Sequence, residues 1–334
     1  MGLRAVSRFG CAAALLVATA WSGTATAAAD ASSASSRAVV EFATTSPHGA
    51  PSGIAFGSDR TMWFTEELGG RLATIDPWTH RVDEYPLAIP FASPRQITAG
   101  PDKHMWFTDV GTNAIGRIDP HTHVATEFPV AGAQKPLSIA AGRDGAMWFT
   151  EPFADHIGRI DPTTHVITEL PVSPAGGTGP LELTAAGDYL WFTQQTGGKI
   201  GRIDTRTRQI TAFALPDAAV TPYGITPASD GSLWFTDFVG QAIWRLDPVT
   251  GDSKRYPLAP QSDPTGILVG PDGAMWFTEF GTDQIGRIDP TTGALKEFQT
   301  PTHGSAPDGI TAGPDRALWF TEFGGSKIGH IRLD

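Results

Sequence analysis

The most constraining feature of the sequence is a tryptophan that returns every 42 or 43 residues. It opens a Trp-Phe-Thr string in each of seven copies, at Trp63, Trp106, Trp148, Trp191, Trp234, Trp276 and Trp319. A fixed period of this length indicates a repeat protein, and about 40–50 residues is the size of one four-stranded propeller blade. The period therefore predicts an all-β protein, a seven-bladed β-propeller.

The sixth copy shows how one repeat divides into four strands. Runs of strand-forming residues at 265–269, 274–279, 284–288 and 294–298 are separated by breaks that carry Gly, Pro or Asp. Such alternation of short β-rich runs with turn residues is typical of antiparallel sheets. The composition agrees, because the chain contains 38 Gly and 27 Pro residues that the many turns require.

The two ends of the repeat array are complementary. The last copy stops at Asp334 after its third strand, 327–331, and a string that resembles a fourth strand, Val39-Val-Glu-Phe, precedes the first copy. An incomplete last blade would leave an open sheet edge, which folded proteins avoid. We therefore expect the N-terminal strand to complete the last blade and to close residues 38–334 into one domain.

The first 29 residues have the features of an export signal. Arg4 and Arg8 precede a short apolar stretch at 9–20, and small residues then lead to Ala27 or Ala29 as the cleavage site. We therefore expect a secreted or periplasmic protein without membrane association after cleavage.

The composition of the mature chain excludes several classes of protein. The formal charge of −11 falls to −13 when the two signal arginines are removed, which disfavours nucleic acid as a partner. The one cysteine, Cys11, lies in the signal, so packing must hold the fold together without disulfides. Residues 30–37 are expected to form a short flexible leader, and we expect the propeller to be a monomer.

Most repeated residues have simple structural interpretations. The seven tryptophans are expected to pack between blades, and the aspartates that begin the hairpin turns are expected to cap their own backbone. Four arginines of the Ile-Gly-Arg-Ile strings are expected to pair with carboxylates between blades: Arg117, Arg159, Arg202 and Arg287. Function is then expected where the copies differ or where they converge on one face.

One position varies within an otherwise uniform repeat. Each first strand opens with Pro-x-x-Ile or Pro-x-x-Leu, and the residue after Pro is Ser52, Arg95, Leu137, Leu181, Tyr223, Thr265 or Asp308. In an up-and-down blade this position lies where the innermost strand begins, on the rim that also carries the loops between second and third strands. We therefore predict a rim for a small-molecule or peptide-like substrate, with Arg95, Tyr223 and Thr265 in contact with it.

A second repeated position on that rim is acidic. The residue three places after each tryptophan is a carboxylate in six of seven copies: Glu66, Asp109, Glu151, Gln194, Asp237, Glu279 and Glu322. Two like charges ~4 Å apart repel by roughly 1 kcal/mol in water and by about 4 kcal/mol at an effective dielectric constant near 20. Either backbone N–H groups and arginines satisfy these carboxylates, or a hard cation such as Mg²⁺ or Ca²⁺ is bound among them. Glu279, Glu322 and Asp308 are the candidate metal ligands.

Two histidines lie in loops of the same rim. His48 and His303 each precede Gly, just before the first and seventh copies, and these copies become neighbours when the ring closes. With Asp308 and Glu322 they are candidates for a catalytic base next to a metal–carboxylate site. The alternative is that both are solvated loop histidines.

The repeated strings resemble those of the virginiamycin B lyases, also called streptogramin B lyases. The resemblance rests on Gly-Pro-Asp-Gly-Ala-Met-Trp-Phe-Thr-Glu, Ile-Gly-Arg-Ile-Asp and Thr-Glu-Phe-Pro, and it spans residues 38–334. It implies a seven-bladed propeller that linearises a cyclic depsipeptide by a Mg²⁺-assisted elimination that breaks its ester. In this reaction a base removes the proton next to a carbonyl, the metal stabilises the enolate, and the alkoxyl oxygen of the ester departs.

The catalytic residues that the resemblance implies are not at their usual positions. The histidines that the family places after the rim prolines of its last two repeats correspond to Thr265 and Asp308. A family glutamate corresponds to Ala306, and the metal-binding glutamate corresponds to Phe323, with Glu322 one residue earlier.

Two hypotheses follow from this mixture of agreement and departure. The first is a carbon–oxygen lyase with His303 or His48 as base, Asp308 and Glu322 as Mg²⁺ ligands, and Arg95 or Tyr223 positioning the substrate. The second is a non-catalytic exported propeller that recognises a glycan, a peptide or a small molecule on its rim. Sugar-lactone hydrolysis fits less well, because the propellers that perform it usually have six blades.

Overall fold

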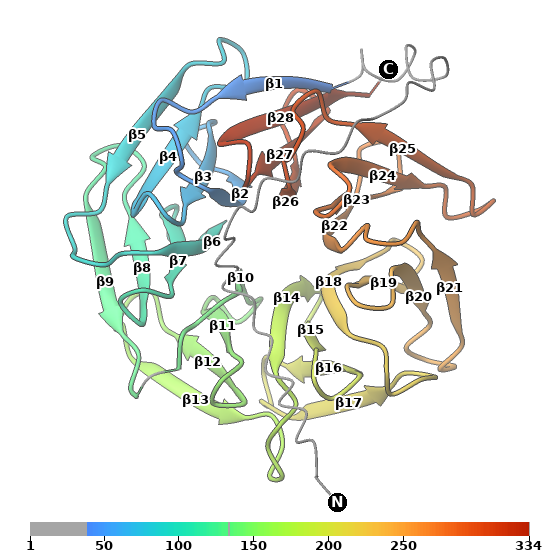
Figure 1. The fold of residues 1–334 in the computed structure, drawn as a ribbon. Coiled ribbons are helices and arrows are strands. Elements are labelled where there is room, and N and C mark those ends of the chain that lie inside the picture. Colours follow the sequence, from blue (N-terminus) through green and yellow to red (C-terminus); the bar gives the residue numbers. More distant parts are fainter. Residues whose placement is uncertain (1–38, 133, 334) are drawn as a thin grey trace, which may run out of the picture.

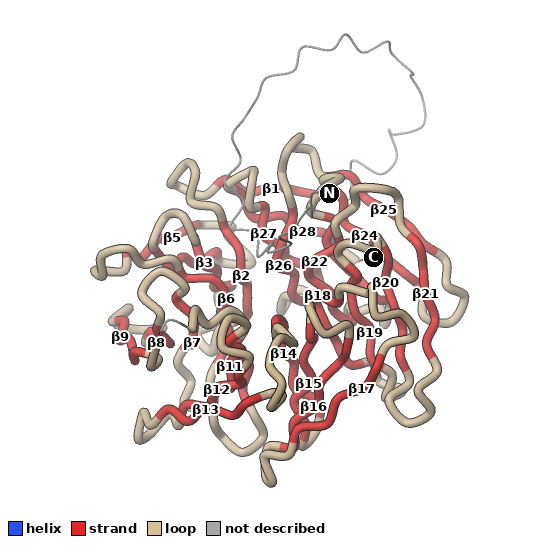
Figure 2. Tube along the Cα trace, turned by 60° about the horizontal axis from the view of Figure 1, so that its bottom comes forward, coloured by secondary structure: helices blue, strands red, loops and turns tan. Residues whose placement is uncertain are grey.

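The computed structural model describes residues 39–132 and 134–333, which form strands, turns and loops (Figures 1 and 2). Seven four-stranded sheets surround a central axis, which confirms the predicted seven-bladed β-propeller. The expected signal peptide and leader lie outside the described residues. Within the described ranges no helix is long and apolar enough to cross a membrane.

Each of the first six blades uses four strands that are consecutive in the chain, numbered from the channel outward. The first blade contains β2 (Pro51–Phe56), β3 (Met62–Glu66), β4 (Arg71–Ile75) and β5 (Val82–Pro86). The second contains β6 (Pro94–Ala99), β7 (Met105–Asp109), β8 (Ala114–Ile118) and β9 (Ala125–Pro129). The third contains β10 (Ile139–Ala141), β11 (Met147–Glu151), β12 (His156–Ile160) and β13 (Ile167–Pro171).

The remaining blades follow the same plan. The fourth contains β14 (Pro180–Ala186), β15 (Tyr189–Gln194), β16 (Lys199–Asp204) and β17 (Ile210–Ala214). The fifth contains β18 (Pro222–Pro227), β19 (Leu233–Asp237), β20 (Ala242–Leu246) and β21 (Ser253–Pro257). The sixth contains β22 (Pro264–Val269), β23 (Met275–Glu279), β24 (Gln284–Ile288) and β25 (Leu295–Gln299), and each strand end agrees with the sequence prediction to within one residue.

The seventh blade joins the two ends of the described chain. Its sheet contains β26 (Pro307–Ala312), β27 (Ala317–Glu322) and β28 (Lys327–Arg332), and its outermost strand is β1 (Val39–Ala43). Strands β1 and β28 are antiparallel, with Val39 opposite Ile331 and Ala43 opposite Lys327. The predicted closure of the ring by the N-terminal strand is therefore confirmed (Figure 1).

The core is divided into seven hydrophobic clusters that lie between consecutive blades. Trp63 of the first blade, for example, packs with Ile97, Met105 and Phe107 of the second, and Trp319 of the seventh packs with residues of the first. The predicted packing role of the tryptophans is therefore correct. Since large aromatic side chains supply much of the apolar area that a core buries, this recurring contact holds the ring together.

Three of the four repeated arginines pair with a carboxylate of their own blade, not between blades as expected: Arg117, Arg159 and Arg287. The fourth, Arg202, lies over the ring of Tyr189 instead. Arg159 Nε lies 2.8 Å from Asp144 Oδ2, and both residues belong to the third blade. The other oxygen of Asp144 accepts a hydrogen bond from Trp148 Nε1 at 2.9 Å. The turn aspartate therefore lies between the arginine and the tryptophan, which explains why it precedes Trp by four residues in most copies.

The threonine of Trp-Phe-Thr joins each blade to the next. Thr150 Oγ1 donates to the backbone oxygen of Leu181 at 2.7 Å and accepts from the Ser138 N–H at 3.0 Å. The acceptor is always the residue after the rim proline of the following blade: Arg95, Leu137, Leu181, Tyr223, Thr265, Asp308 and Ser52. We refer to this closed set of seven bonds as the threonine ring.

Replacing one of these threonines tests the threonine ring. Thr150→Val preserves the shape of the side chain but leaves the buried Leu181 oxygen and Ser138 N–H without their partner, so we expect a loss of about 1–3 kcal/mol of unfolding free energy. Thr150→Ser retains the hydroxyl and is expected to lose less than Thr150→Val. Denaturant unfolding monitored by tryptophan fluorescence measures both, and equal losses in the two variants would contradict the role of the hydroxyl.

Candidate functional site

Five of the seven residues after the rim prolines meet at the channel. They line one cavity of about 110 Å³ together with Glu182, whereas Leu137 and Leu181 are not among its lining residues. The five come from the first, second, fifth, sixth and seventh blades: Ser52, Arg95, Tyr223, Thr265 and Asp308. The variable position of the repeat thus gathers polar side chains from around the ring.

Arg95 is at the centre of this cluster. Its Nη2 donates to the Tyr223 hydroxyl at 3.0 Å and lies 3.4 Å from Asp308 Oδ2, while its Nη1 lies 2.7 Å from Glu67 Oε2. Burial works against the charge of this guanidinium, but Asp308, Tyr223 and Glu67 together hold the pKa of Arg95 above its ordinary value. Burial also raises the pKa of Tyr223, so its hydroxyl keeps a proton that it can donate to a ligand.

Hydrogen bonds hold both Asp308 and Thr265 in place. Asp308 Oδ2 accepts a hydrogen bond from Ser52 Oγ at 3.0 Å, across the junction between the seventh and first blades. Thr265 Oγ1 lies 2.8 Å from Thr278 Oγ1, and both hydroxyls are buried. Asp308 is therefore fixed and charge-compensated, and Thr265 is tied into its own blade.

Glu182 is the cavity residue that the sequence analysis missed. Its Oε2 accepts a hydrogen bond from Ser138 Oγ at 3.0 Å, and burial raises its pKa to about 7, with Ser138 and Arg95 acting in the opposite direction. A signal for it was present, because the second residue after the rim proline is Gly in four copies. It is polar in three consecutive copies: Gln96, Ser138 and Glu182.

The two rim histidines lie elsewhere. His303 has a fully exposed side chain whose Nδ1 is 3.3 Å from Asp283 Oδ2, in a shallow surface depression with Gln299 and Thr300. His48 is exposed in a loop where its φ is 65°. Neither histidine lines the cavity that holds Asp308, so the structure does not bring the predicted base candidates to the channel.

The predicted metal ligands do not converge either. Glu279 and Glu322 end the second strands of their blades, are fully buried, and do not line the channel cavity. Each faces a glutamate on the outermost strand of its own blade, Glu297 or Glu41, and burial raises the pKa of Glu279 to about 7 and that of Glu322 to about 8. The reason is that neighbouring blades cover both faces of a second strand, so its last side chain points between blades.

Local groups satisfy some of the other acidic residues of this position. Asp109 accepts hydrogen bonds from the N–H groups of Ser93, Gly111 and Thr112, and Glu66 lies 3.2 Å from Arg71 Nε. For Asp109 the alternative of backbone N–H groups therefore holds. Glu66 has the Arg71 guanidinium beside it, but neither of its carboxylate oxygens has a hydrogen-bond partner among the described residues.

The Mg²⁺ that the resemblance implies does not fit the cavity well. Mg²⁺ requires several oxygen ligands in near-octahedral geometry. Asp308 is the one predicted ligand in the cavity, and the same oxygen faces Ser52 and the Arg95 guanidinium. Because Arg95 already supplies positive charge there, we derive the chemistry of the channel from the residues alone.

The fold defines a class of protein: seven-bladed β-propellers whose variable residues meet at one end of the central channel. Comparison with known proteins then identifies the chain as a member of the virginiamycin B lyase family, whose model matches residues 37–259 and 208–334. We found no curated protein that matches the sequence.

Solved structures agree with this assignment. A streptogramin B lyase is 33% identical with a TM-score of 0.82, over 89% of this chain and 97% of that chain. Virginiamycin B lyase from Staphylococcus aureus is 32% identical with a TM-score of 0.81, over 89% and 99% of the two chains. A catalytically inactive variant of the same enzyme, solved with quinupristin, is 30% identical over the same shares with a TM-score of 0.81. Hydrazine synthase from Kuenenia stuttgartiensis, at 14% identity and a TM-score of 0.71, shares the fold alone.

Proposed function

We propose that the protein is a carbon–oxygen lyase that opens a cyclic ester or depsipeptide at the mouth of its channel, with Glu182 as the base. The observation that carries this proposal is a glutamate with a pKa of about 7 in the same cavity as Arg95 and Tyr223. A general base works best when its pKa is near the working pH, and perturbed carboxylates of this kind concentrate at active sites.

The chemistry follows from the charges of the three side chains. The Glu182 carboxylate accepts the proton from the carbon next to a carbonyl, and the guanidinium of Arg95 with the Tyr223 hydroxyl stabilises the negative charge that develops on the carbonyl oxygen. The electron pair forms a carbon–carbon double bond as the ester C–O bond breaks, so the product is a linear isomer that ends in a carboxylate. The cavity of about 110 Å³ admits only the reacting part, and the rest of the substrate would lie on the rim.

Mass spectrometry of a streptogramin B incubated with the purified mature protein tests this proposal. We expect a linear product of unchanged mass, and a rate at least about 100-fold lower in Glu182→Gln, since general-base catalysis typically contributes 10²–10⁴-fold. The exposed His303 serves as the matched control: His303→Ala should retain nearly the full rate. Loss of turnover in His303→Ala with retention in Glu182→Gln would assign the base to the histidine, as the sequence analysis expected.

Two further arms of this experiment cover the remaining expectations. Turnover that survives EDTA is expected if Arg95 replaces the Mg²⁺ of the family. Turnover that is lost on chelation would show that the reaction requires a metal ion.

The second candidate function is binding without catalysis, and it is favoured by Thr265 and Asp308 at the positions where the family has histidines. Saturable binding of the cyclic compound at high protein concentration, with no product, would support that alternative and exclude this lyase activity.

From the sequence at 1–29 we further propose that the protein is exported. We also propose that it acts as a monomer.

A further inference from the structure

Five of the seven blades carry a pair of facing carboxylates away from the channel. The residue that ends the second strand faces a glutamate on the outermost strand of the same sheet. The pairs are Glu66 with Glu84, Asp109 with Glu127, Glu151 with Glu169, Glu279 with Glu297, and Glu322 with Glu41. Facing carboxylates at buried positions repel each other, so each pair is stabilised by a bound proton or by a positive charge beside it.

The first residue of the third strand is placed to supply that charge. In the first blade Arg71 Nε lies 3.2 Å from Glu66 Oε2, and its Nη1 lies 2.9 Å from Glu84 Oε2. In the seventh blade Lys327 Nζ lies 2.6 Å from Glu41 Oε2. A cationic side chain therefore offsets part of the repulsion in these two blades, and it acts against the effect of burial on the pKa of Glu66 and Glu322.

The third blade differs, because histidine stands at this position. His156 lies opposite Glu151 in the pairing of β11 with β12, just as Arg71 lies opposite Glu66 and Lys327 opposite Glu322. Glu169 lies on β13, two residues before the partner of His156. A neutral imidazole has a lone pair that can bind a metal ion, which neither arginine nor lysine offers at neutral pH.

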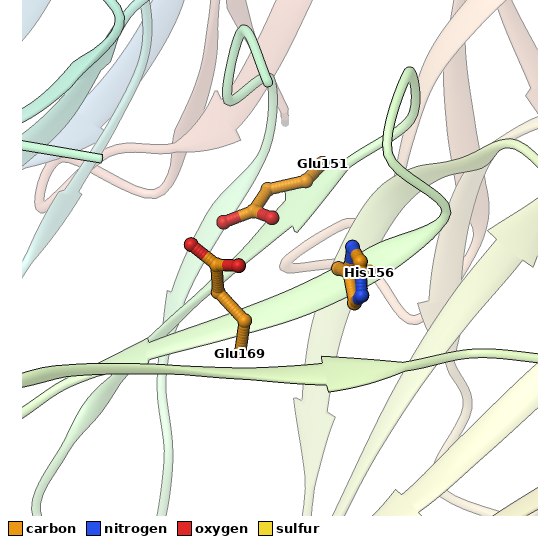
Figure 3. Close-up of side chains that lie close together, drawn as sticks. All are labelled: Glu151, His156 and Glu169. Carbon is orange, nitrogen blue, oxygen red and sulfur yellow. The ribbon is translucent and has the colours of Figure 1, made fainter. Parts of the chain in front are cut away.

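The side chains of this trio are close together and poorly satisfied. Glu151 is fully buried, and neither of its carboxylate oxygens has a hydrogen-bond partner among the described residues. The same is true of Glu66 and Glu322, so the histidine, and not the unpartnered glutamate, distinguishes the third blade. The buried Nδ1 of His156 lacks such a partner too. Figure 3 shows the carboxylates of Glu151 and Glu169 facing each other, with the imidazole of His156 beside them. One potential ligand atom from each residue lies within 4.8 Å of the other two.

We propose that Glu151, His156 and Glu169 form a binding site for a first-row divalent metal ion, and that the bound ion is Zn²⁺. One imidazole and two carboxylates suit Zn²⁺, whereas Mg²⁺ and Ca²⁺ prefer sets of oxygen ligands. At bond lengths of about 2.0–2.2 Å the ligands of a tetrahedral zinc lie about 3.4 Å apart, so ligand atoms that lie within 4.8 Å of one another would approach by up to about 1.4 Å on binding. The two carboxylates balance the charge of the ion, and the fourth position is open to water.

The site would clamp the outer part of the third blade. It joins β11, β12 and β13, and the loop between the first two contains Asp155, whose Oδ1 accepts the N–H groups of Thr178 and Gly179. It is separate from the channel cavity, and it stands whether or not the protein is a lyase.

Zinc titration of the full mature chain, after removal of metals with EDTA and dialysis, tests the site. Calorimetry is expected to show one Zn²⁺ per chain, with a zinc-dependent rise in Tm. His156→Lys recreates the arrangement of the seventh blade, so it should fold normally and bind zinc at least 100-fold more weakly. Glu66→Gln, which alters a pair that has no histidine, is the control and should bind zinc as the parent chain does.

The coordination can be read directly. X-ray absorption at the zinc edge is expected to show one imidazole and carboxylate oxygens, and the imidazole signal should vanish in His156→Lys. Undiminished zinc binding in His156→Lys would place the ion elsewhere, for instance at the exposed His303. A folded parent chain that does not bind zinc would show that the three side chains form a cluster without a metal ion. Either result would overturn the proposal.

Discussion

A chain that lacks residues 38–43 is expected to lose its closed ring and to associate with other copies through the exposed edge of β28. Val39 is buried with Ile331 in the core between the sixth and seventh blades, and β1 pairs with β28 along its whole length. Glu41 also accepts the Thr302 N–H at 2.7 Å, which ties the strand to the loop before β26. The loss is comparable to the roughly 5–15 kcal/mol by which domains are stable, so little folded monomer should remain.

Light scattering measures the association state of the truncated chain, and circular dichroism measures its folding and Tm. Addition of a peptide of residues 38–44 then tests whether the missing strand restores the parent state. Because an unpaired edge accepts an added strand, the peptide in excess should restore a monomer with the parent Tm. A monomeric truncated chain with an unchanged Tm would show that closure contributes nothing.

A pair of matched substitutions separates closure from packing. Phe42 on β1 and Phe298 on β25 occupy equivalent outer-strand positions, are half-buried, and stack on Trp319 and Trp276 with ring centroids 6.0 and 5.4 Å apart. Each change to Ala should cost about 2 kcal/mol or more of unfolding free energy from lost packing. Only Phe42→Ala should also populate concentration-dependent dimers. The reason is that β25 is connected to its neighbour β24 by a hairpin, whereas no hairpin connects β1 to its neighbour β28.

The free energy of unfolding is expected to fall as the pH rises from about 5 to 8. The buried glutamates that end the second strands have raised pKa values in the folded protein: about 7 for Glu66 and Glu279, and about 8 for Glu151 and Glu322. Burial is the main cause, and the facing outer-strand glutamate adds to it. An unfolded glutamate titrates near its ordinary value of 4.5.

The sign follows from proton binding. Between pH 4.5 and 8 the folded chain holds protons that unfolding releases, so removing protons from solution favours the unfolded state. One pKa unit corresponds to about 1.4 kcal/mol, and we expect a Tm about 5 °C or more lower at pH 8 than at pH 5. Below pH 4 the opposite slope should appear, because hydrogen bonds from the turn backbone lower the pKa of aspartates such as Asp289.

Calorimetric scans in EDTA across this range measure the slope, and Glu279→Gln is the diagnostic variant. Among the described residues no cation contributes to the pKa of Glu279, because the third strand of this blade begins with Gln284 where other blades have Arg71 or Lys327. At pH 5 the Tm of the variant should therefore equal that of the parent or lie slightly below it. At pH 8 the Tm of the variant should be higher. A Tm that is flat between pH 5 and 8 in the parent chain would mean that these glutamates ionise normally.

Most of the fold was predictable because the same strand and turn residues recur in the sequence of each blade. The position of Trp63 and its six counterparts gives the number of blades, and Gly, Pro and Asp mark the turns. Closure was predictable as well, since Val39-Val-Glu-Phe repeats the fourth-strand pattern. The pairing partner of the arginines was not, because periodicity alone does not say which of two nearby carboxylates a long side chain reaches.

The candidate site was predictable only in part. The residues after the rim prolines begin the innermost strands, so topology alone placed Arg95, Tyr223 and Asp308 on the channel. Glu182 was missed because only the first position after the proline was considered. The direction in which the loops of His48 and His303 point depends on left-handed backbone turns and local hydrogen bonds, which the sequence pattern does not encode.

The threonine ring separates the support of the channel from its chemistry. Each hydroxyl holds the backbone oxygen of a residue after a rim proline, and that bond is the same for Leu181, Arg95 or Asp308. Exchange of the side chain therefore leaves the frame intact. A lineage can change what enters the channel by substituting the five of these positions that line the cavity, and a protein engineer can randomise the same five codons together without rebuilding the propeller.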